Sequence, residues 1–300
     1  MGARIEVAGL TKAYGDLVAV DDLSFTVEPG EFFGLLGPNG AGKTTALEMM
    51  EGLRKPDSGT VDIDGHDPWK REPELQRRLG VQLQSSAFFE RLTAREQLAT
   101  FAALYDAPRE RVDALLAQVG LEDKAESRVE QLSGGQAQRL SIACALVHDP
   151  EVVFLDEPSA ALDPQARRNL WEFLHGLNDS GRTVVLTTHY MEEAEELCDR
   201  VAIIDAGRLL ELDSPAALVR GLDAPTRISL APDAIDAAEA RRLDGVEDVT
   251  VHPDRTELST RRPADVLAAL AARDALHGLT ASGASLEDVF LHLTGREYRS

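Results

Sequence analysis

Cysteine and lysine are scarce in this 300-residue chain, and it has no long apolar run. Its two cysteines, Cys144 and Cys198, cannot form a disulfide framework, so we expect both to fill core space in a reducing compartment. No stretch approaches the about 20 consecutive apolar residues that a membrane-spanning helix requires, and the first residues lack the apolar block of a signal peptide. The sequence therefore predicts a cytoplasmic chain, unless a partner holds it at a membrane.

Basic residues are also in short supply. The 31 Lys and Arg residues stand against 52 Asp and Glu residues, which gives a formal net charge of −21. Such acidity argues against a nucleic-acid-binding surface and against direct electrostatic attachment to anionic lipid. Apolar residues make up 43% of the chain, a share typical of a globular protein with a buried core. We therefore expect a folded protein without a nucleic-acid partner.

Short apolar segments alternate with helical patterns over the first two thirds of the chain. Residues 32–36, 152–155 and 183–187 read as buried strands, and each is followed by a segment with helical periodicity. Strands that alternate with helices predict an α/β fold with a mostly parallel sheet that is covered on both faces. Between about residues 86 and 134 the pattern is mostly helical, which predicts a helical subdomain inside this α/β domain.

The composition changes near residue 215, and strands and helices then alternate on a smaller scale. We expect residues 1–221 to form the first domain and residues 222–300 to form an accessory domain. The order of the elements in the accessory domain favours a small α+β fold of the split βαβ kind.

A glycine-rich segment follows the first buried strand and precedes a helix. It matches the pattern G-x-x-x-x-G-K-[ST] in full, and strand, loop and helix together are the context that confirms this motif. Glycines let successive backbone N–H groups face a phosphate, and the helix N-terminus adds its partial positive charge. Lys43 should reach the β- and γ-phosphates, and the Thr44 hydroxyl should ligate Mg²⁺. The expected nucleotide contacts are Gly37, Pro38, Asn39, Gly40, Ala41, Gly42, Lys43, Thr44 and the adjacent Thr45.

Two adjacent carboxylates, Asp156 and Glu157, follow the buried strand at 152–155. Ligands of α/β sheets bind at the carboxyl ends of the strands, so this position places both acids near the phosphate loop, residues 37–44. Asp156 suits the shell of a Mg²⁺ ion, and Glu157 suits a base or orienter for the water that attacks the γ-phosphate. Alone, such a pair could equally be the acidic N-cap of a helix. Beside a phosphate loop, the catalytic interpretation is favoured.

A third motif, Leu132-Ser133-Gly134-Gly135-Gln136, precedes a helical segment. Ser133 can cap that helix, and the two glycines leave backbone N–H groups open to an anion. By itself this pattern is an ordinary turn before a helix. The anion-binding interpretation is favoured here, because the motif stands shortly before Asp156 in a chain that already has the phosphate loop.

These motifs, in this order, resemble the ATP-binding cassette (ABC) family of transporter ATPases over about residues 3–220. The resemblance implies a P-loop NTPase fold, an ATP and Mg²⁺ site, and a dimer of two such chains. In this family the signature, here Ser133, Gly135 and Gln136, contacts the γ-phosphate held by the opposite subunit. It further implies that Tyr14 stacks on the adenine with Val20 as a flanking contact, and that Gln84 senses Mg²⁺ and the attacking water. The resemblance also implies that Asp163 belongs to the loop between the two sites and that His189 touches the γ-phosphate.

Some of these assignments have alternatives. Gln82 lies two residues from Gln84 and competes for its role, although the spacing to Leu92 favours Gln84. Tyr14 could be a core or turn residue, because stacking requires geometry that a sequence does not give. A lone histidine at the end of a buried strand, such as His189, is usually structural. Its place before an acidic helix in this family context makes the catalytic role the better interpretation.

The C-terminal segment 285–295 looks like the tail of stand-alone ATPases that serve drug, antibiotic, lipid or polysaccharide exporters. The resemblance therefore implies an ATP-hydrolysing motor subunit on the cytoplasmic face of the membrane, with a polytopic membrane subunit as partner. An importer motor and a non-transport cytosolic ATPase are the alternatives. The terminal helix carries one apolar face, which we expect to pack against the first domain or, preferably, against a second copy of the accessory domain. That face consists of Leu286, Val289, Phe290 and Leu293.

Overall fold

The structure, a computed structural model, describes residues 2–82, 88–160, 162–179 and 181–295. They form two compact units, which divide between Pro215 and Ala216. The first unit corresponds to the α/β domain and the second to the accessory domain. The division falls near the start of helix α8 (Pro215–Gly221), whereas the sequence places the boundary after that helix.

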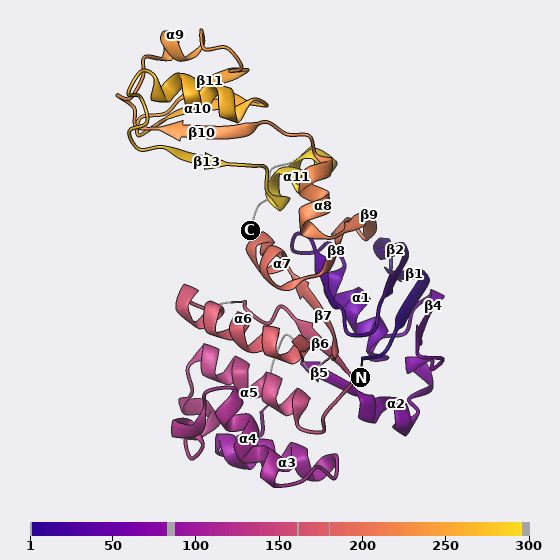
Figure 1. Ribbon diagram of the computed structural model, residues 1–300. Helices are drawn as coiled ribbons and strands as arrows, with labels where there is room; N and C mark the ends of the chain where they lie inside the picture. The colour runs from indigo at the N-terminus through magenta and orange to yellow at the C-terminus, as the bar shows by residue number, and fades with distance from the viewer. Residues whose placement is uncertain (1, 83–87, 161, 180, 296–300) are drawn as a thin grey trace. The chain divides into compact units, whose positions relative to one another are not determined.

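A six-stranded sheet forms the centre of the first unit (Figure 1). All neighbouring strands are parallel except the last pair, where β9 runs antiparallel to β8. Every residue of β3 and β6 is buried, as expected for strands covered on both faces. The predicted α/β fold with a mostly parallel sheet is therefore confirmed. The strand order is β5 (Leu79–Gln82), β6 (Val152–Asp156), β7 (Thr183–Thr188), β3 (Phe32–Leu36), β8 (Arg200–Asp205) and β9 (Arg208–Asp213).

A three-stranded antiparallel sheet, of order β2-β1-β4, completes the sheet structure of this unit. Its strands are β1 (Ile5–Tyr14), β2 (Leu17–Val27) and β4 (Ser58–Ile63). Apolar residues of all three strands share one core with β3, β6 and helix α1 (Lys43–Met50). Tyr14 ends β1 next to the turn that leads to β2, and it is 42% exposed.

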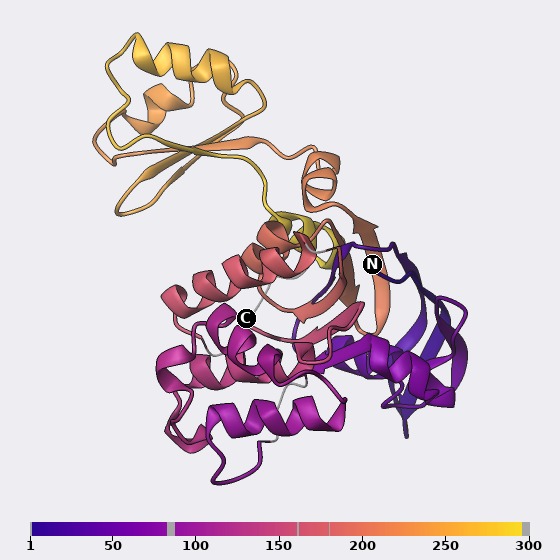
Figure 2. The same ribbon diagram turned by 60° about the horizontal axis from the view of Figure 1, so that its bottom comes forward.

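Two helices lie in the segment predicted to form a helical subdomain, α3 (Ala94–Leu104) and α4 (Glu110–Gln118), and α5 (Gly134–Leu146) begins where that segment ends. Two views show α3 and α4 on the side of the first unit opposite to the antiparallel sheet (Figure 1, Figure 2). Thr93 caps α3 and Ser133 caps α5. In each case the side-chain oxygen of the residue three positions later, Glu96 or Gln136, accepts in return from the backbone N–H of the cap residue. The remaining helices of the unit are α2 (Pro73–Arg78), α6 (Pro164–Asp179) and α7 (Met191–Leu197).

The second unit contains a four-stranded antiparallel sheet of order β11-β12-β10-β13. Strands and helices follow one another as β-α-β-β-α-β, which is the split βαβ arrangement that the sequence predicts. The unit has a core of its own, built around Ile228, Leu258 and Leu270. After α8, its elements are β10 (Thr226–Leu230), α9 (Ala237–Ala240), β11 (Asp248–Val251), β12 (Thr256–Thr260), α10 (Pro263–Ala271), β13 (Thr280–Ser282) and α11 (Leu286–Thr294).

The terminal helix α11 is amphipathic, as predicted. Ser285 caps it, and Asp288 in its first turn pairs with Arg227. However, Leu286, Val289 and Phe290 are only 0%, 5% and 3% exposed in the single chain. Leu293, the fourth residue of the predicted face, is half-buried. Packing of this face against a second copy of the accessory domain stays a prediction.

Truncation tests the division into units. We expect a chain that ends at Gly221 to fold and to bind ATP with unchanged affinity, because the core of the second unit is separate from the core around the phosphate loop. Thermal unfolding and calorimetric ATP titration of the full and shortened chains would measure this. A shortened chain that is insoluble or does not bind ATP would make the second unit part of the catalytic fold.

Candidate active site

The phosphate loop joins β3 to helix α1. Gly40 and Gly42 have positive φ angles of 80° and 99°, which let the loop curl back over the start of the helix. A Cβ atom on Gly42 would lie 2.1 Å from the carbonyl oxygen of Ala19, so only glycine fits there. Gly42 stands at the N-cap without a side chain to bond the first helical N–H groups. Those N–H groups are therefore available for an anion, as the motif predicts.

Lys43 is the buried cation of this loop. Its side chain is 4% exposed, and Nζ donates hydrogen bonds to the carbonyl oxygens of Gly37 at 2.8 Å and Pro38 at 3.0 Å. Burial lowers the pKa of Lys43, while the neighbouring carboxylates Glu157 and Asp156 oppose that shift. The ammonium group is thus positioned beside the loop before any phosphate arrives.

A cavity of about 480 Å³ opens beside the phosphate loop. This volume lies within the range of about 300–1,000 Å³ that is typical of small-molecule sites. The ring of Tyr14 lines the cavity, and the Arg54 guanidinium lies 5.4 Å from the ring centroid. An exposed ring at the rim of such a cavity is suited to stacking on a base. The other lining residues are Leu17, Ala19, Asn39, Gly40, Gly42, Lys43, Thr44, Thr45 and Glu157.

Asp156 and Thr44 form an oxygen-rich pair at the carboxyl end of β6. The Thr44 hydroxyl donates to Asp156 Oδ1 at 3.1 Å, and the Thr187 hydroxyl donates to the same oxygen. Burial raises the pKa of Asp156, and these two hydrogen bonds act in the opposite direction. A hydroxyl and a carboxylate within reach of the phosphate loop fit Mg²⁺, which takes one or two protein carboxylates and completes its shell with phosphate and water. In the part of the chain that the structure describes, no group of three or more His, Cys, Asp or Glu side chains could hold a metal by itself.

Glu157 lies between Lys43 and His189. One carboxylate oxygen is 3.6 Å from Lys43 Nζ, and the other is 3.2 Å from His189 Nδ1. The backbone of Glu157 has φ of 47°, an uncommon conformation for a residue with a side chain. Its N–H donates to the Thr187 hydroxyl at 3.0 Å, which holds this conformation in place. Local strain of this kind persists where the surroundings fix it, and it is concentrated at functional sites.

The structure therefore brings together Lys43, Thr44, Asp156, Glu157 and His189, five residues from three separate parts of the sequence. Their convergence follows from the sheet order, because β3, β7 and β6 are neighbours and all run in the same direction. The segments that leave these three strands thus meet at one edge, at the topological position where such sheets bind ligands.

The signature segment, residues 133–136, lies apart from the phosphate-loop cavity. Ser133 Oγ accepts from Gln136 N at 3.3 Å, and Gln136 Oε1 accepts from Ser133 N at 2.9 Å. Ser133 and Gly134 are exposed, and a Cβ atom on Gly134 would meet no atom within 4 Å. None of the four residues is among the described residues that line the cavity. The helix N-terminus that they form faces outward and is open.

Other predicted residues occupy different positions. Gln84 lies outside the described residues, while Gln82 is 1% exposed at the end of β5. Asp163 is exposed and caps α6 by accepting from Gln165 N and Ala166 N. Val20 is 1% exposed and belongs to the core. Instead, its neighbours Leu17 and Ala19 line the cavity. Successive side chains of a strand point to opposite faces, so Val20 on the core face places Leu17 and Ala19 on the other face. This alternation is the sequence signal that could have distinguished the cavity residues from the core residue.

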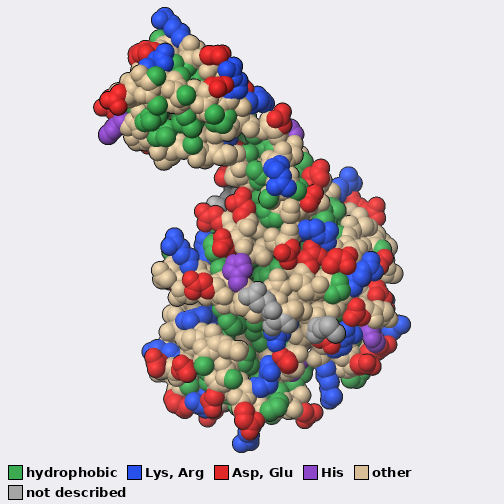
Figure 3. Space-filling model, in the orientation of Figure 1, with side chains coloured by type: hydrophobic (Ala, Val, Ile, Leu, Met, Phe, Trp, Pro, Cys, Tyr) green, Lys and Arg blue, Asp and Glu red, His purple; other side chains and the backbone are tan. Residues whose placement is uncertain are grey.

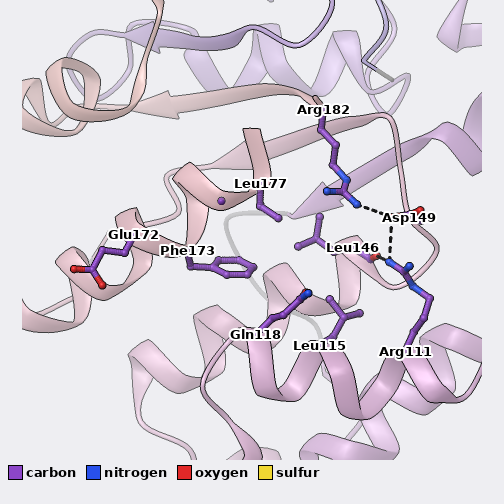
Figure 4. A pocket seen from close by; sticks show the side chains of 10 residues that line it. Arg111, Leu115, Gln118, Leu146, Asp149, Glu172, Phe173, Leu177 and Arg182 are labelled. Atoms are coloured by element: carbon purple, nitrogen blue, oxygen red, sulfur yellow. Dashed lines mark hydrogen bonds and ion pairs between the residues drawn. The ribbon is translucent and has the colours of Figure 1, made fainter. Parts of the chain in front are cut away.

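A second cavity of equal volume, about 480 Å³, lies between α4, α5 and α6 (Figure 4). Its two arginines, Arg111 and Arg182, both pair with Asp149. Leu115, Leu146 and Phe173 supply its apolar wall. The charges here neutralise one another, and no phosphate loop contributes to the lining. Chemistry rather than volume thus identifies the phosphate-loop cavity as the candidate nucleotide site.

Comparison with known proteins gives a consistent result. A family profile described as ABC transporter matches residues 20–160. The chain is 40% identical, over the full length of both proteins, to the Nod factor export ATP-binding protein I of Cupriavidus metallidurans. It is 42% identical to the protein of the same name from Burkholderia thailandensis, with 98% of each chain covered.

Solved structures agree. An ATP-binding subunit of an ABC transporter matches with a TM-score of 0.66 and 29% identity, over 72% of this chain and 92% of that one. A dimeric ATP-binding cassette in a post-hydrolysis state, bound to ADP and Pi, matches with a TM-score of 0.64 and 29% identity, over 70% of this chain and 98% of that one.

Proposed function

The chain belongs to the ABC transporter family and is an ATPase subunit, and from this premise we propose that it drives export through a separate membrane protein. The observation that carries the proposal is the convergence of Lys43, Asp156, Glu157 and His189 at one edge of the sheet. Phosphoryl transfer requires mainly positioning and charge neutralisation around the γ-phosphate, and these residue types supply both.

Each residue then has a role. Tyr14 stacks on the adenine, the backbone N–H groups of the phosphate loop bind the phosphates, and Lys43 reaches the β- and γ-phosphates. Thr44 and Asp156 would hold Mg²⁺, which neutralises phosphate charge when it is bound.

Glu157 orients the attacking water and accepts its proton. Lys43 and His189, at 3.6 and 3.2 Å, keep its carboxylate beside the position of the γ-phosphate. His189 thereby places the base and also faces the phosphate itself.

We further propose that a second copy of the chain closes the site. The open helix N-terminus at Ser133 and Gly134 suits an anion but lies away from the chain's own cavity. In a head-to-tail dimer, the signature segment of one copy would meet the γ-phosphate bound by the other. Because phosphates bridge the two copies, ATP should supply part of the interface energy.

Sedimentation tests this dimer. The Glu157→Gln chain, which should retain ATP, is expected to be monomeric without nucleotide and dimeric with Mg·ATP. ADP serves as the control, because it lacks the γ-phosphate that the signature segment would contact. An unchanged mass on adding ATP would contradict the dimer.

Export is the direction that the relatives favour, since their names describe Nod factor export. Among the described helices, none is long and apolar enough to span a membrane, so the translocation path would come from a partner. We propose a peripheral position on the cytoplasmic face, held by a polytopic membrane subunit. Detergent extraction and affinity purification of the chain should recover such a protein, and recovery of a solute-binding protein with it would instead indicate import.

The alternative of a nucleic-acid-associated ATPase is less favourable. The net charge of −21 opposes phosphate-backbone binding. On the face drawn in Figure 3, acidic side chains are scattered among basic ones and no large basic block is visible. Retention of the chain by ribosomes or DNA at physiological salt would favour that alternative.

A further inference from the structure

Two aromatic rings are in contact just after the end of β7. The ring centroids of His189 and Tyr190 are 4.1 Å apart, and their planes lie at 40° to each other. Side chains of adjacent residues in an extended strand point to opposite sides, so this contact requires a bend in the chain. A hydrogen bond from Tyr190 N to the Thr188 hydroxyl, 2.9 Å long, closes that bend. The local backbone thus directs the two neighbouring rings toward each other.

Tyr190 occupies the N-cap position of α7, but its side chain makes no capping hydrogen bond. Ser, Thr, Asp and Asn are strongly preferred at this position, because their short side chains accept from the first helical N–H groups. Capping therefore does not account for a tyrosine here. Tyr190 is also not among the described residues that line the phosphate-loop cavity. Its ring contacts are the remaining explanation for this residue.

Arg167, on α6, makes the second contact to this ring. Its guanidinium carbon lies 4.2 Å from the Tyr190 ring centroid, within the about 6 Å over which an aromatic face attracts a cation. Arg167 Nε is buried and has no hydrogen-bond partner in the part of the chain that the structure describes. The backbone N–H of Arg167 donates to the carbonyl oxygen of Asp163 at 2.9 Å, which fixes this residue in the first turn of α6. The ring face is therefore a principal contact of this guanidinium, and it joins α6 to the segment after β7.

The other end of this arrangement is the candidate general base. His189 Nδ1 lies 3.2 Å from a carboxylate oxygen of Glu157, and the His189 side chain is 12% exposed. Rotation of the imidazole about its side-chain bonds would move Nδ1 away from that oxygen. A ring packed against the imidazole restricts such rotation. The contacts thus form a series from Arg167 through Tyr190 and His189 to Glu157.

We propose that Tyr190 is a positioning residue for ATP hydrolysis, which holds the imidazole of His189 toward Glu157 and is itself held by Arg167. The inference rests on the proposed roles of His189 and Glu157. Positioning of this kind affects the reaction strongly, because a small displacement of a catalytic group can slow the chemical step by a large factor.

Two substitutions of Tyr190 separate the ring from the rest of the side chain. Tyr190→Leu removes the ring, and we expect kcat to fall about 10–100-fold, the effect of misplacing a catalytic group by about 1 Å. The Kd for ADP should stay unchanged, because the phosphate loop and Tyr14 are untouched. Tyr190→Phe keeps the ring and should keep a near-native kcat. Phosphate release at saturating Mg·ATP and calorimetric titration would measure both quantities.

A double-mutant cycle with His189→Ala distinguishes positioning from a general structural role. If Tyr190 acts through His189, then Tyr190→Leu should slow the His189→Ala chain by no more than about twofold, the usual limit of agreement in such cycles. A merely structural defect would instead slow both backgrounds by the same factor. Single-turnover measurements over hours, with the chain in excess over ATP, keep the slow variants measurable.

Arg167→Ala tests the same series from α6, and it serves if Tyr190→Leu does not fold. We expect kcat to fall about 2–5-fold, because a partly exposed cation–π contact is weak, and we expect no further fall when Tyr190→Leu or His189→Ala is already present. Arg168→Ala is the matched control, because Arg168 is the next residue on α6 and is exposed. Its kcat should equal that of the native chain.

The inference is overturned if folded Tyr190→Leu keeps the native kcat, or if Tyr190→Phe is as slow as Tyr190→Leu. It is also overturned if Tyr190→Leu or Arg167→Ala slows the His189→Ala chain as much as it slows the native chain. Failure of the proposed function is a different result, in which Glu157→Gln or His189→Ala itself keeps the native kcat.

Discussion

Glu157→Gln should bind ATP as tightly as the native chain and hydrolyse it about 10²–10⁴-fold more slowly, the range attributed to a general base. The amide keeps the size of the side chain, so the pocket retains its shape. It cannot accept the proton of the attacking water, and it loses the charge that faces Lys43 and His189 at 3.6 and 3.2 Å. Phosphate release at saturating Mg·ATP, together with calorimetric titration, would separate the two effects.

Glu172→Gln is the matched control, because Glu172 is an exposed carboxylate on α6 outside the phosphate-loop cavity. Its turnover should equal that of the native chain. Near-native hydrolysis by Glu157→Gln would remove Glu157 from the mechanism and would leave Asp156 as the remaining acid at the end of β6.

Lys43→Ala should act on binding rather than on turnover alone. Lys43 Nζ is buried beside the phosphate loop, where a charge-assisted hydrogen bond to phosphate is strong. Removing one partner of a buried charge pair costs at least about 2 kcal/mol, which corresponds to roughly a 30-fold weaker Kd for ATP. Titration in the Glu157→Gln background would avoid turnover during the measurement.

Lys124→Ala provides the control for lost charge, because Lys124 is exposed in the helical subdomain. Its ATP affinity should match that of the native chain. Equal affinities for Lys43→Ala and Lys124→Ala would show that the phosphates bind elsewhere.

Contiguous motifs explain why much of the site could be predicted from the sequence. The phosphate loop is one strand–loop–helix segment, so its residues are neighbours before folding begins. Asp156 and Glu157 end a strand whose burial is visible in its apolar run, and the parallel sheet then places them beside Lys43.

Side-chain direction is what the sequence leaves open. Val20 and Ala19 differ by one position on β2, yet one belongs to the core and the other lines the cavity. The acidic run on α7 gives no sign that Glu193 is buried while Glu192 is exposed. In both cases the tertiary packing of neighbouring elements decides which face turns inward. The apolar face of α11 shows the same limit, because amphipathicity reveals a buried face but does not identify its partner.

The dependence of specific activity on protein concentration tests the central claim most directly, namely that ATP is hydrolysed at Glu157 in a site completed by a second copy. Phosphate release per chain would be measured at saturating Mg·ATP over a dilution series, with Glu157→Gln as the background. Our account predicts that the rate per chain rises with concentration toward a plateau and is lost in Glu157→Gln. A rate per chain that is constant on dilution, or that persists in Glu157→Gln, would contradict it.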